Sequence, residues 1–284
     1  MIPPMHLTHW RGKAPWGSDA QIEQDLVLTK ALIQLYSDPL LTEAFVFRGG
    51  TAMQKLFYDS PTRYSEDIDI VQVRAEPIGP AINALRQHLD PWLGRLSYER
   101  KTARFTMIYR FDSEIPPVQS MRLKIEINTG EHFAVMKPHR RNLRCDSEWF
   151  NGAADVLTYK IEELLGTKMR ALFQRKKGRD LYDLAMALNH FKKLDLAKTV
   201  HCFQRYMEHG KTTVTRAQFE ANLAGKLKDA AFRQDVQPLL APDAPSFDVD
   251  AEGERVKTAL LALLPDDPWK DLGEIKPKKE RARS

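Results

Sequence analysis

Hydrophobic residues recur with helical spacing early in the chain and then give way to a short apolar run. Residues 19–36 carry a largely helical apolar pattern, and Ser18 precedes them as a candidate N-cap. The apolar run 45–47 stops at a Gly-Gly pair, and residues 51–58 have helical composition with Thr51 in a capping position. This order predicts a helix, followed by a strand, a glycine turn and a second helix.

Three later segments alternate between apolar and polar residues, as strands do when their two faces have different surroundings. They are residues 66–73, 105–111 and 121–128, with Pro116-Pro117 supplying a turn between the last two. Together with the earlier elements they predict a mixed α/β domain over residues 1–150.

Helical periodicity replaces the alternation beyond residue 151, so we expect a mainly helical domain over residues 151–274. Residues 275–284 are rich in Lys and Arg and have almost no apolar content, which predicts a disordered tail. The helical pattern is found over residues 156–174, 181–191, 197–208 and 218–228.

The composition argues against a membrane-spanning, secreted or zinc-binding protein. No stretch of the 284 residues approaches the roughly 18 apolar residues of a membrane span, and the first residues lack the order of a signal peptide, so a cytoplasmic protein is expected. Cys145 and Cys202 stand far apart without a zinc-ligand grouping. The formal net charge of +5 favours a nucleotide or RNA as partner, and no pattern specific to DNA is evident.

Two aspartates separated by one residue are the most informative feature. Asp67 and Asp69 lie in an alternating segment, so both side chains project from one face of the expected strand. Paired carboxylates raise one another's pKa unless a cation lies between them, and Mg²⁺ prefers such oxygen ligands. A solvated acidic face on an edge strand is the alternative for so short a motif.

The Gly49-Gly50-Thr51 segment lies between the expected strand and helix upstream. Glycines let a phosphate approach backbone N–H groups, and the helix dipole favours an anion there. A Gly-Gly pair alone is most often only a turn, but followed by paired carboxylates it predicts a site for a metal-bound NTP. Glu126 is a candidate third ligand for two Mg²⁺ ions, or else an exposed strand glutamate paired with a lysine.

Lys168 interrupts the apolar stripe of its expected helix, which is costly unless the ammonium reaches solvent or meets a carboxylate or phosphate. Asp180 and Asp183 follow at the start of the next expected helix, where acids suit the helix dipole whatever their function. Asp180 is also a candidate to receive Lys168 or to orient an attacking hydroxyl. The basic runs 137–144 and 175–179 favour a polyanionic acceptor, although the first is equally explained as a solvated loop.

Four of these segments occur in an order that carries a resemblance: Phe47-Arg48-Gly49-Gly50-Thr51, Tyr64-Ser65-Glu66-Asp67-Ile68-Asp69, the helix of Lys168, and Arg179-Asp180. Over roughly residues 30–190 the chain resembles the AbiEii/AbiGii toxin family of polymerase-β-like nucleotidyltransferases, to which the MenT toxins are related.

The resemblance implies a polymerase-β-like α/β (α+β) fold with a small mixed sheet and a helical C-terminal domain. It also implies a toxin–antitoxin or phage-defence setting with a cognate antitoxin and, for some members, nucleotide transfer to the tRNA acceptor end. The implied roles are triphosphate binding by Gly49 and Gly50 with Ser65 as a phosphate or nucleotide contact, Mg²⁺ binding by Asp67 and Asp69, and completion of the site by Lys168 and Asp180. We also expect Thr51 to bind the triphosphate together with the two glycines.

The resulting hypothesis is a Mg²⁺-dependent transfer of a nucleoside monophosphate from an NTP to an RNA acceptor, with pyrophosphate released. Two alternatives stay open. One is the same chemistry on a protein or a small molecule, and the other is a nucleotide-sensing binding module that releases no pyrophosphate.

Overall fold

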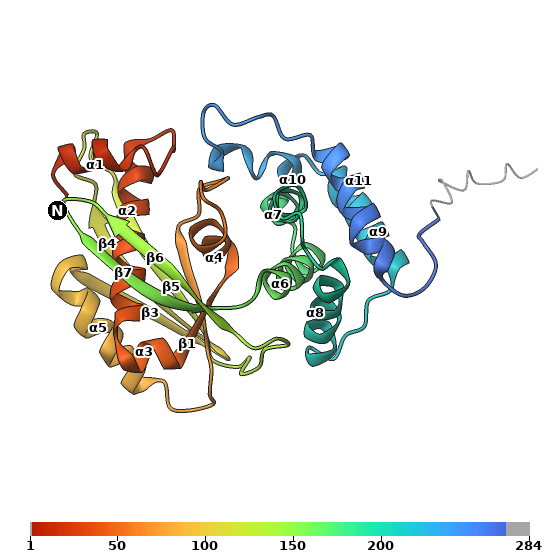
Figure 1. The fold of residues 1–284 in the computed structure, drawn as a ribbon, viewed down its shortest axis with the longest axis horizontal. Coiled ribbons are helices and arrows are strands. Elements are labelled where there is room, and N and C mark those ends of the chain that lie inside the picture. Colours follow the sequence, from red (N-terminus) through yellow and green to blue (C-terminus); the bar gives the residue numbers. More distant parts are fainter. Residues whose placement is uncertain (1, 271–284) are drawn as a thin grey trace, which may run out of the picture.

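A mixed β-sheet and a group of helices make up the part of the chain that the structure describes, residues 2–270 of a computed structural model (Figure 1). The seven strands of the sheet lie in the order β3-β4-β5-β2-β1-β7-β6, which confirms the mixed α/β fold expected from the sequence. The strands are β1 (Phe45–Arg48), β2 (Asp67–Gln72), β3 (Arg95–Lys101), β4 (Arg104–Asp112), β5 (Ser120–Asn128), β6 (His139–Asp146) and β7 (Asn151–Thr158).

Strand β2 lies between β1, to which it is antiparallel, and β5, to which it is parallel. The β3-β4-β5 segment is antiparallel, and β7 pairs with β1 in parallel and with β6 in antiparallel fashion. Alternation along β2 and β5 sends Ile68, Ile70 and Ile125 to one face, where all three are buried, and the acidic side chains to the other. Each buried isoleucine stabilises the fold by roughly 1.5–3 kcal/mol.

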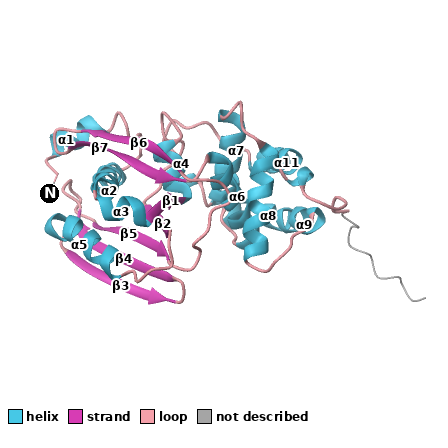
Figure 2. Ribbon diagram, turned by 60° about the horizontal axis from the view of Figure 1, so that its bottom comes forward, coloured by secondary structure: helices cyan, strands magenta, loops and turns pink. Residues whose placement is uncertain are grey.

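The apolar face of the sheet is covered by helices from the first part of the chain (Figure 2). Helix α4 lies against the opposite face, where its Met53 joins Val46 of β1 in a second core shared with the C-terminal helices. The helices of this part are α1 (Pro4–Trp10), α2 (Asp19–Ser37), α3 (Pro39–Ala44), α4 (Gly49–Leu56) and α5 (Gly79–Leu93).

The C-terminal helices pack around the second core and border α4 (Figure 1). We call residues 2–158 the sheet part and residues 159–270 the helical part. The predicted division of the chain near residue 150 stays a prediction. The C-terminal elements are α6 (Ile161–Gln174), α7 (Gly178–His190), α8 (Leu196–His209), α9 (Arg216–Leu227), α10 (Ala230–Gln234), α11 (Val249–Ala259) and the 3₁₀ turns Gln237–Leu239 and Leu261–Leu263.

Of the two helix caps predicted from the sequence, one is confirmed by the structure and one is wrong. Ser18 caps α2, accepting a hydrogen bond from the Gln21 N–H at 3.2 Å as expected. The predicted cap at Thr51 is wrong, because α4 begins two residues earlier at Gly49. Strand β7 occupies a segment whose last residues carry helical periodicity, and residues 275–284 lie outside the described part of the chain. Over residues 2–270, no helix combines the length and apolar character needed to cross a membrane.

Candidate active site

The glycine turn joins β1 directly to α4, and both glycines are required by close contacts. Gly49 has φ of +83°, and a Cβ there would collide with the carboxylate of Asp69. A Cβ at Gly50 would collide with the guanidinium of Arg63. The backbone at the start of α4 is therefore bare and close to the acidic strand β2.

Asp67 and Asp69 project from the same face of β2, as predicted, and the register places Asp69 opposite Arg48 on one side and Glu126 on the other. Desolvation and the neighbouring carboxylates of Glu126 and Asp67 together outweigh Arg48 and raise the pKa of Asp69. The side chain of Asp69 forms no hydrogen bond or ion pair with any residue in the described range 2–270. A partly buried carboxylate without a partner suits a divalent cation.

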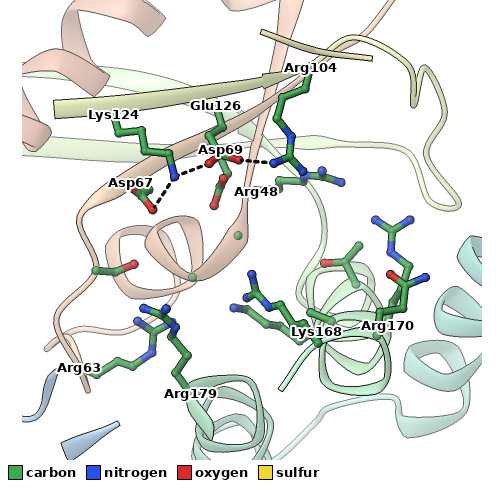
Figure 3. Close-up of a pocket in the computed structure, with 17 residues that line it drawn as sticks. Arg48, Arg63, Asp67, Asp69, Arg104, Lys124, Glu126, Lys168, Arg170 and Arg179 are labelled. Atoms are coloured by element: carbon green, nitrogen blue, oxygen red, sulfur yellow. Dashed lines mark ion pairs between the residues drawn. The ribbon is translucent and has the colours of Figure 1, made fainter. Parts of the chain in front are cut away.

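Glu126 lies beside these aspartates but is already paired. The ammonium of Lys124 forms an ion pair with Glu126 and lies 3.5 Å from Oδ2 of Asp67, and Arg104 lies 3.7 Å from Glu126 (Figure 3). The pairing of Glu126 with a lysine is thus found, and its role as a third metal ligand stays a prediction. Residues 2–270 contain no group of three or more His, Cys, Asp or Glu side chains placed to hold a metal ion by themselves. The donor set fits a cation held by two carboxylates and completed by substrate oxygens and water.

Thr51 is buried and connects α4 to the segment before β2. Its hydroxyl lies 2.8 Å from the Ser65 Oγ and donates a hydrogen bond to the Asp67 carbonyl at 2.5 Å. Ser65 lines the pocket described below, whereas Thr51 does not. Thr51 therefore positions Ser65 and Asp67 from behind.

Lys168 meets two carboxylates in the interior, which settles how its position in an apolar stripe is tolerated. Its Nζ lies 3.2 Å from Asp180 Oδ1 and 2.8 Å from Asp183 Oδ2. Asp183 also accepts two hydrogen bonds of 2.7 Å from Arg63, and Asp180 accepts two from Arg175. Burial opposes ionisation of Asp183, but Arg63 and Lys168 outweigh it and hold the pKa of Asp183 well below its usual range.

Asp180 is fully buried behind Lys168 and does not line the pocket. Its contact with Lys168 matches the first of the two roles considered for it, and both roles stay predictions. Asp183, which the sequence offered only as a dipole partner, joins Arg63 of the sheet part to α7 of the helical part.

Glu131, in the loop after β5, was not anticipated from the sequence. It accepts a 2.7 Å hydrogen bond from Arg48 and forms a bidentate pair with Arg170 of α6. Burial disfavours its charge, but Arg170 and Arg48 outweigh that effect and lower the pKa of Glu131 to about 2. Its partners are far away in sequence and its loop has no periodicity, so no local signal marked it.

The Glu131→Gln variant is expected to lose about 1.5–3 kcal/mol of unfolding free energy at pH 7, because two guanidinium groups lose their charged acceptor. The folded pKa of Glu131 lies below its ordinary value of 4.5, so this contribution is present above about pH 4.5 and is lost as the pH falls towards 2. Denaturant titrations from pH 3 to 8 measure the difference. Glu254→Gln, which alters an exposed helix pair, serves as the control, and a pH-independent difference for Glu131→Gln would contradict the assignment.

These elements enclose a pocket of about 490 Å³ between the sheet and helices α6 and α7 (Figure 3). The acidic groups lie on the sheet side, and Lys168 and Arg179 lie across from them. Eight basic side chains and three carboxylates line the pocket, and several of the basic groups are also paired with carboxylates behind the lining, such as Asp183 and Glu131. The surface that the pocket presents is therefore richer in cations than in anions. The charged lining residues are Arg48, Arg63, Arg104, Lys124, Lys168, Arg170, Arg175 and Arg179 with Asp67, Asp69 and Glu126.

The basic run 137–144 does not border this pocket. Most of it belongs to β6, at the far edge of the sheet and separated from β2 by β1 and β7. Arg140 pairs with Glu43, and Arg141 donates to the Leu56 carbonyl. The run therefore contributes no side chain to this pocket, most of it is strand and not loop, and its preference for a polyanionic acceptor stays a prediction.

The profile of the family described as "Nucleotidyl transferase AbiEii toxin, Type IV TA system" matches residues 30–260. The chain belongs to the AbiEii toxin family. It is accordingly a nucleotidyltransferase toxin that takes an NTP as substrate, and the resemblance inferred from the four sequence segments is confirmed. A search of curated proteins gives no match.

Solved structures share the fold of this AbiEii-family chain. MenT4, a nucleotidyltransferase toxin of Mycobacterium tuberculosis H37Rv, superposes with a TM-score of 0.61 at 14% identity, covering 93% of this chain and 89% of that one. JHP933 from Helicobacter pylori gives a TM-score of 0.53 at 16% identity, covering 87% and 92%. At these identities the likeness establishes the nucleotidyltransferase fold and nothing finer.

Proposed function

We propose that this AbiEii-family toxin transfers a nucleoside monophosphate from a Mg²⁺-bound NTP to the 3′ end of a tRNA, releasing pyrophosphate. The observation that carries the proposal is the placement of Asp67 and Asp69 against the bare glycine turn, inside a pocket lined mainly by cations. Carboxylates that hold a cation and donors that hold phosphates are the two parts that an NTP requires.

Asp67 and Asp69 would hold one or two Mg²⁺ ions, and Glu126 would join them by exchanging its pair with Lys124. The metal, when bound, supplies stabilisation of the charge that develops on the transferred phosphoryl group. Glu126 is the least available of the three carboxylates, because Lys124 and Arg104 already neutralise it.

The remaining groups act by positioning and by charge. Backbone N–H groups at Gly49 and Gly50 and the hydroxyl of Ser65 would contact the triphosphate at the start of α4. Lys168 would neutralise phosphate charge from the opposite wall, with Asp180 holding its ammonium in place. Catalysis would then rest on alignment of the acceptor hydroxyl with the α-phosphorus and on charge stabilisation in a confined site.

We place this activity in a cytoplasmic toxin–antitoxin or phage-defence system with a cognate antitoxin. Membership of the AbiEii toxin family supports the toxin–antitoxin setting. The cationic lining supports a polyanionic second substrate, because charge of this sign attracts an RNA backbone to the site.

Purified protein incubated with Mg²⁺, each α-labelled NTP in turn and total bacterial tRNA is expected to place label in the tRNA band of a denaturing gel. The Asp67→Ala variant, as a folded control, should leave the band unlabelled. Label on the protein or on a small molecule would contradict the RNA acceptor, and NTP binding without pyrophosphate release would favour a nucleotide-sensing module.

A further inference from the structure

The face of the sheet that carries Asp67 and Asp69 continues over β5, β4 and β3. The registers place Asp69 opposite Glu126, and Glu126 opposite Thr106 of β4. The charged side chains on this face of β3 and β4 are exposed, whereas Met107 and Tyr109 on the other face are fully buried. We call this solvent-facing surface of β3, β4 and β5 the open face.

Three arginines stand side by side across the open face. Arg95 of β3 is directly opposite Arg110 of β4, and Arg110 is directly opposite Arg122 of β5. Like charges in directly opposed positions destabilise a sheet. None of the three forms an ion pair within residues 2–270, and the guanidinium of Arg110 donates to the Ser97 Oγ at 2.5 Å. No carboxylate among the described residues therefore pairs directly with the row to offset its mutual repulsion.

The arginine row is close to the catalytic strand. Arg122 precedes Lys124 by two residues on the same face of β5, a separation of roughly 7 Å along the strand, and Lys124 lies 3.5 Å from Asp67. Arg110 and Arg122 also line a second hollow of about 490 Å³ together with Glu66, the residue between Ser65 and Asp67 of the nucleotide pocket. A chain bound along the row would thus reach the strand that carries the carboxylates.

We propose that Arg95, Arg110 and Arg122 bind backbone phosphates of the RNA acceptor and guide its 3′ end to the carboxylates. This inference rests on the proposed function, since it assigns the second substrate of the same site. Under the proposed function the glycine turn and Lys168 bind the triphosphate. The arginine row is therefore available to bind a second polyanion. Guanidinium groups bind phosphate oxygens in bidentate fashion, and backbone contacts of this kind position a nucleic acid without reading its sequence.

The test measures the affinity of the full chain for 5′-labelled tRNA by fluorescence anisotropy, without NTP, at salt concentrations from 50 to 200 mM. In Arg95→Ser/Arg110→Ser/Arg122→Ser, the slope of log affinity against log salt should fall by about 2, because each lost phosphate contact removes about 0.7–0.9. Affinity at 150 mM salt should fall roughly tenfold or more. The triple Arg→Lys variant should keep most of the slope, and KM for NTP should stay unchanged.

A matched control removes three exposed charges from the helical part, Lys192→Ser/Lys193→Ser/Arg205→Ser, and should keep the wild-type slope. If the wild-type protein binds and labels tRNA but the slope is unchanged in the triple Arg→Ser variant, the role of the arginine row is refuted and the proposed function is not. Wild-type protein that neither binds nor labels tRNA would overturn both. Should the triple variant fail to fold, Arg110→Ser alone must lower the slope by about 0.7 for the inference to survive.

Discussion

Replacing Asp69 with Asn is expected to reduce nucleotide transfer by about 10³-fold while raising the unfolding temperature at pH 7. Desolvation and the nearby carboxylates of Glu126 and Asp67 raise the pKa of Asp69, so its ionisation in the folded state opposes folding. The variant removes that charge without changing the shape of the side chain. Its advantage over wild type should be full above the raised pKa and should vanish as the pH falls below the unfolded value of about 3.9.

Thermal melts from pH 3 to 8, with and without MgCl₂, measure both parts of this prediction. Mg²⁺ should raise the unfolding temperature of the wild type and have little effect on Asp69→Asn, because the cation loses one of two ligands. Asp112→Asn, an exposed acid on β4, is the control. A variant that melts lower than wild type at pH 7, or that retains transfer, would contradict the role given to Asp69.

Asp183→Ala is expected to lower the free energy of unfolding by about 3–5 kcal/mol, the largest stability effect we expect of a single substitution in the site. Asp183 is fully buried between Arg63 and Lys168, and its loss leaves the Arg63 guanidinium without a counter-charge in the interior. Because the folded pKa of Asp183 is lowered, the contribution is present above about pH 4 and is lost in acid.

Chemical denaturation of Asp183→Ala, Arg63→Met and the double variant measures this prediction. The double variant should recover a large part of the loss, because removing both charges avoids an unpaired buried ion. A loss below about 1 kcal/mol for Asp183→Ala, as is usual for exposed pairs, would show that the cluster is solvated.

The strands that bear the catalytic candidates were predictable because their alternation is strong. Around Asp69 in β2 and Glu126 in β5 every second residue is a buried isoleucine or leucine, so the sequence alone indicated which side the two acids occupy. Lys168 was predictable as an anomaly, since a charge within an apolar stripe demands a partner.

Other elements lack such signals. β6 consists mainly of exposed polar residues and β7 is rich in alanine and glycine, so neither shows a clear alternation. β7 joins the sheet by pairing with β1, and β6 joins it by pairing with β7. The capping role predicted for Thr51 was wrong because the left-handed backbone at Gly49 lets α4 begin at Gly49, two residues before Thr51. The arginine row depends on strand register, which local sequence does not provide.

The ion pairs Arg63–Asp183 and Arg170–Glu131 cross between the sheet part and the helical part, and both basic partners line the nucleotide pocket. Under the proposed function, a bound nucleotide therefore contacts both the sheet part and the helical part and stabilises the packing of one on the other. At a nucleotide concentration 100 times Kd, such a ligand adds about 2.7 kcal/mol to the folded state. The lifetime of the toxin against cellular proteases should then follow the energy charge of its host, with starved cells degrading it sooner than well-fed ones.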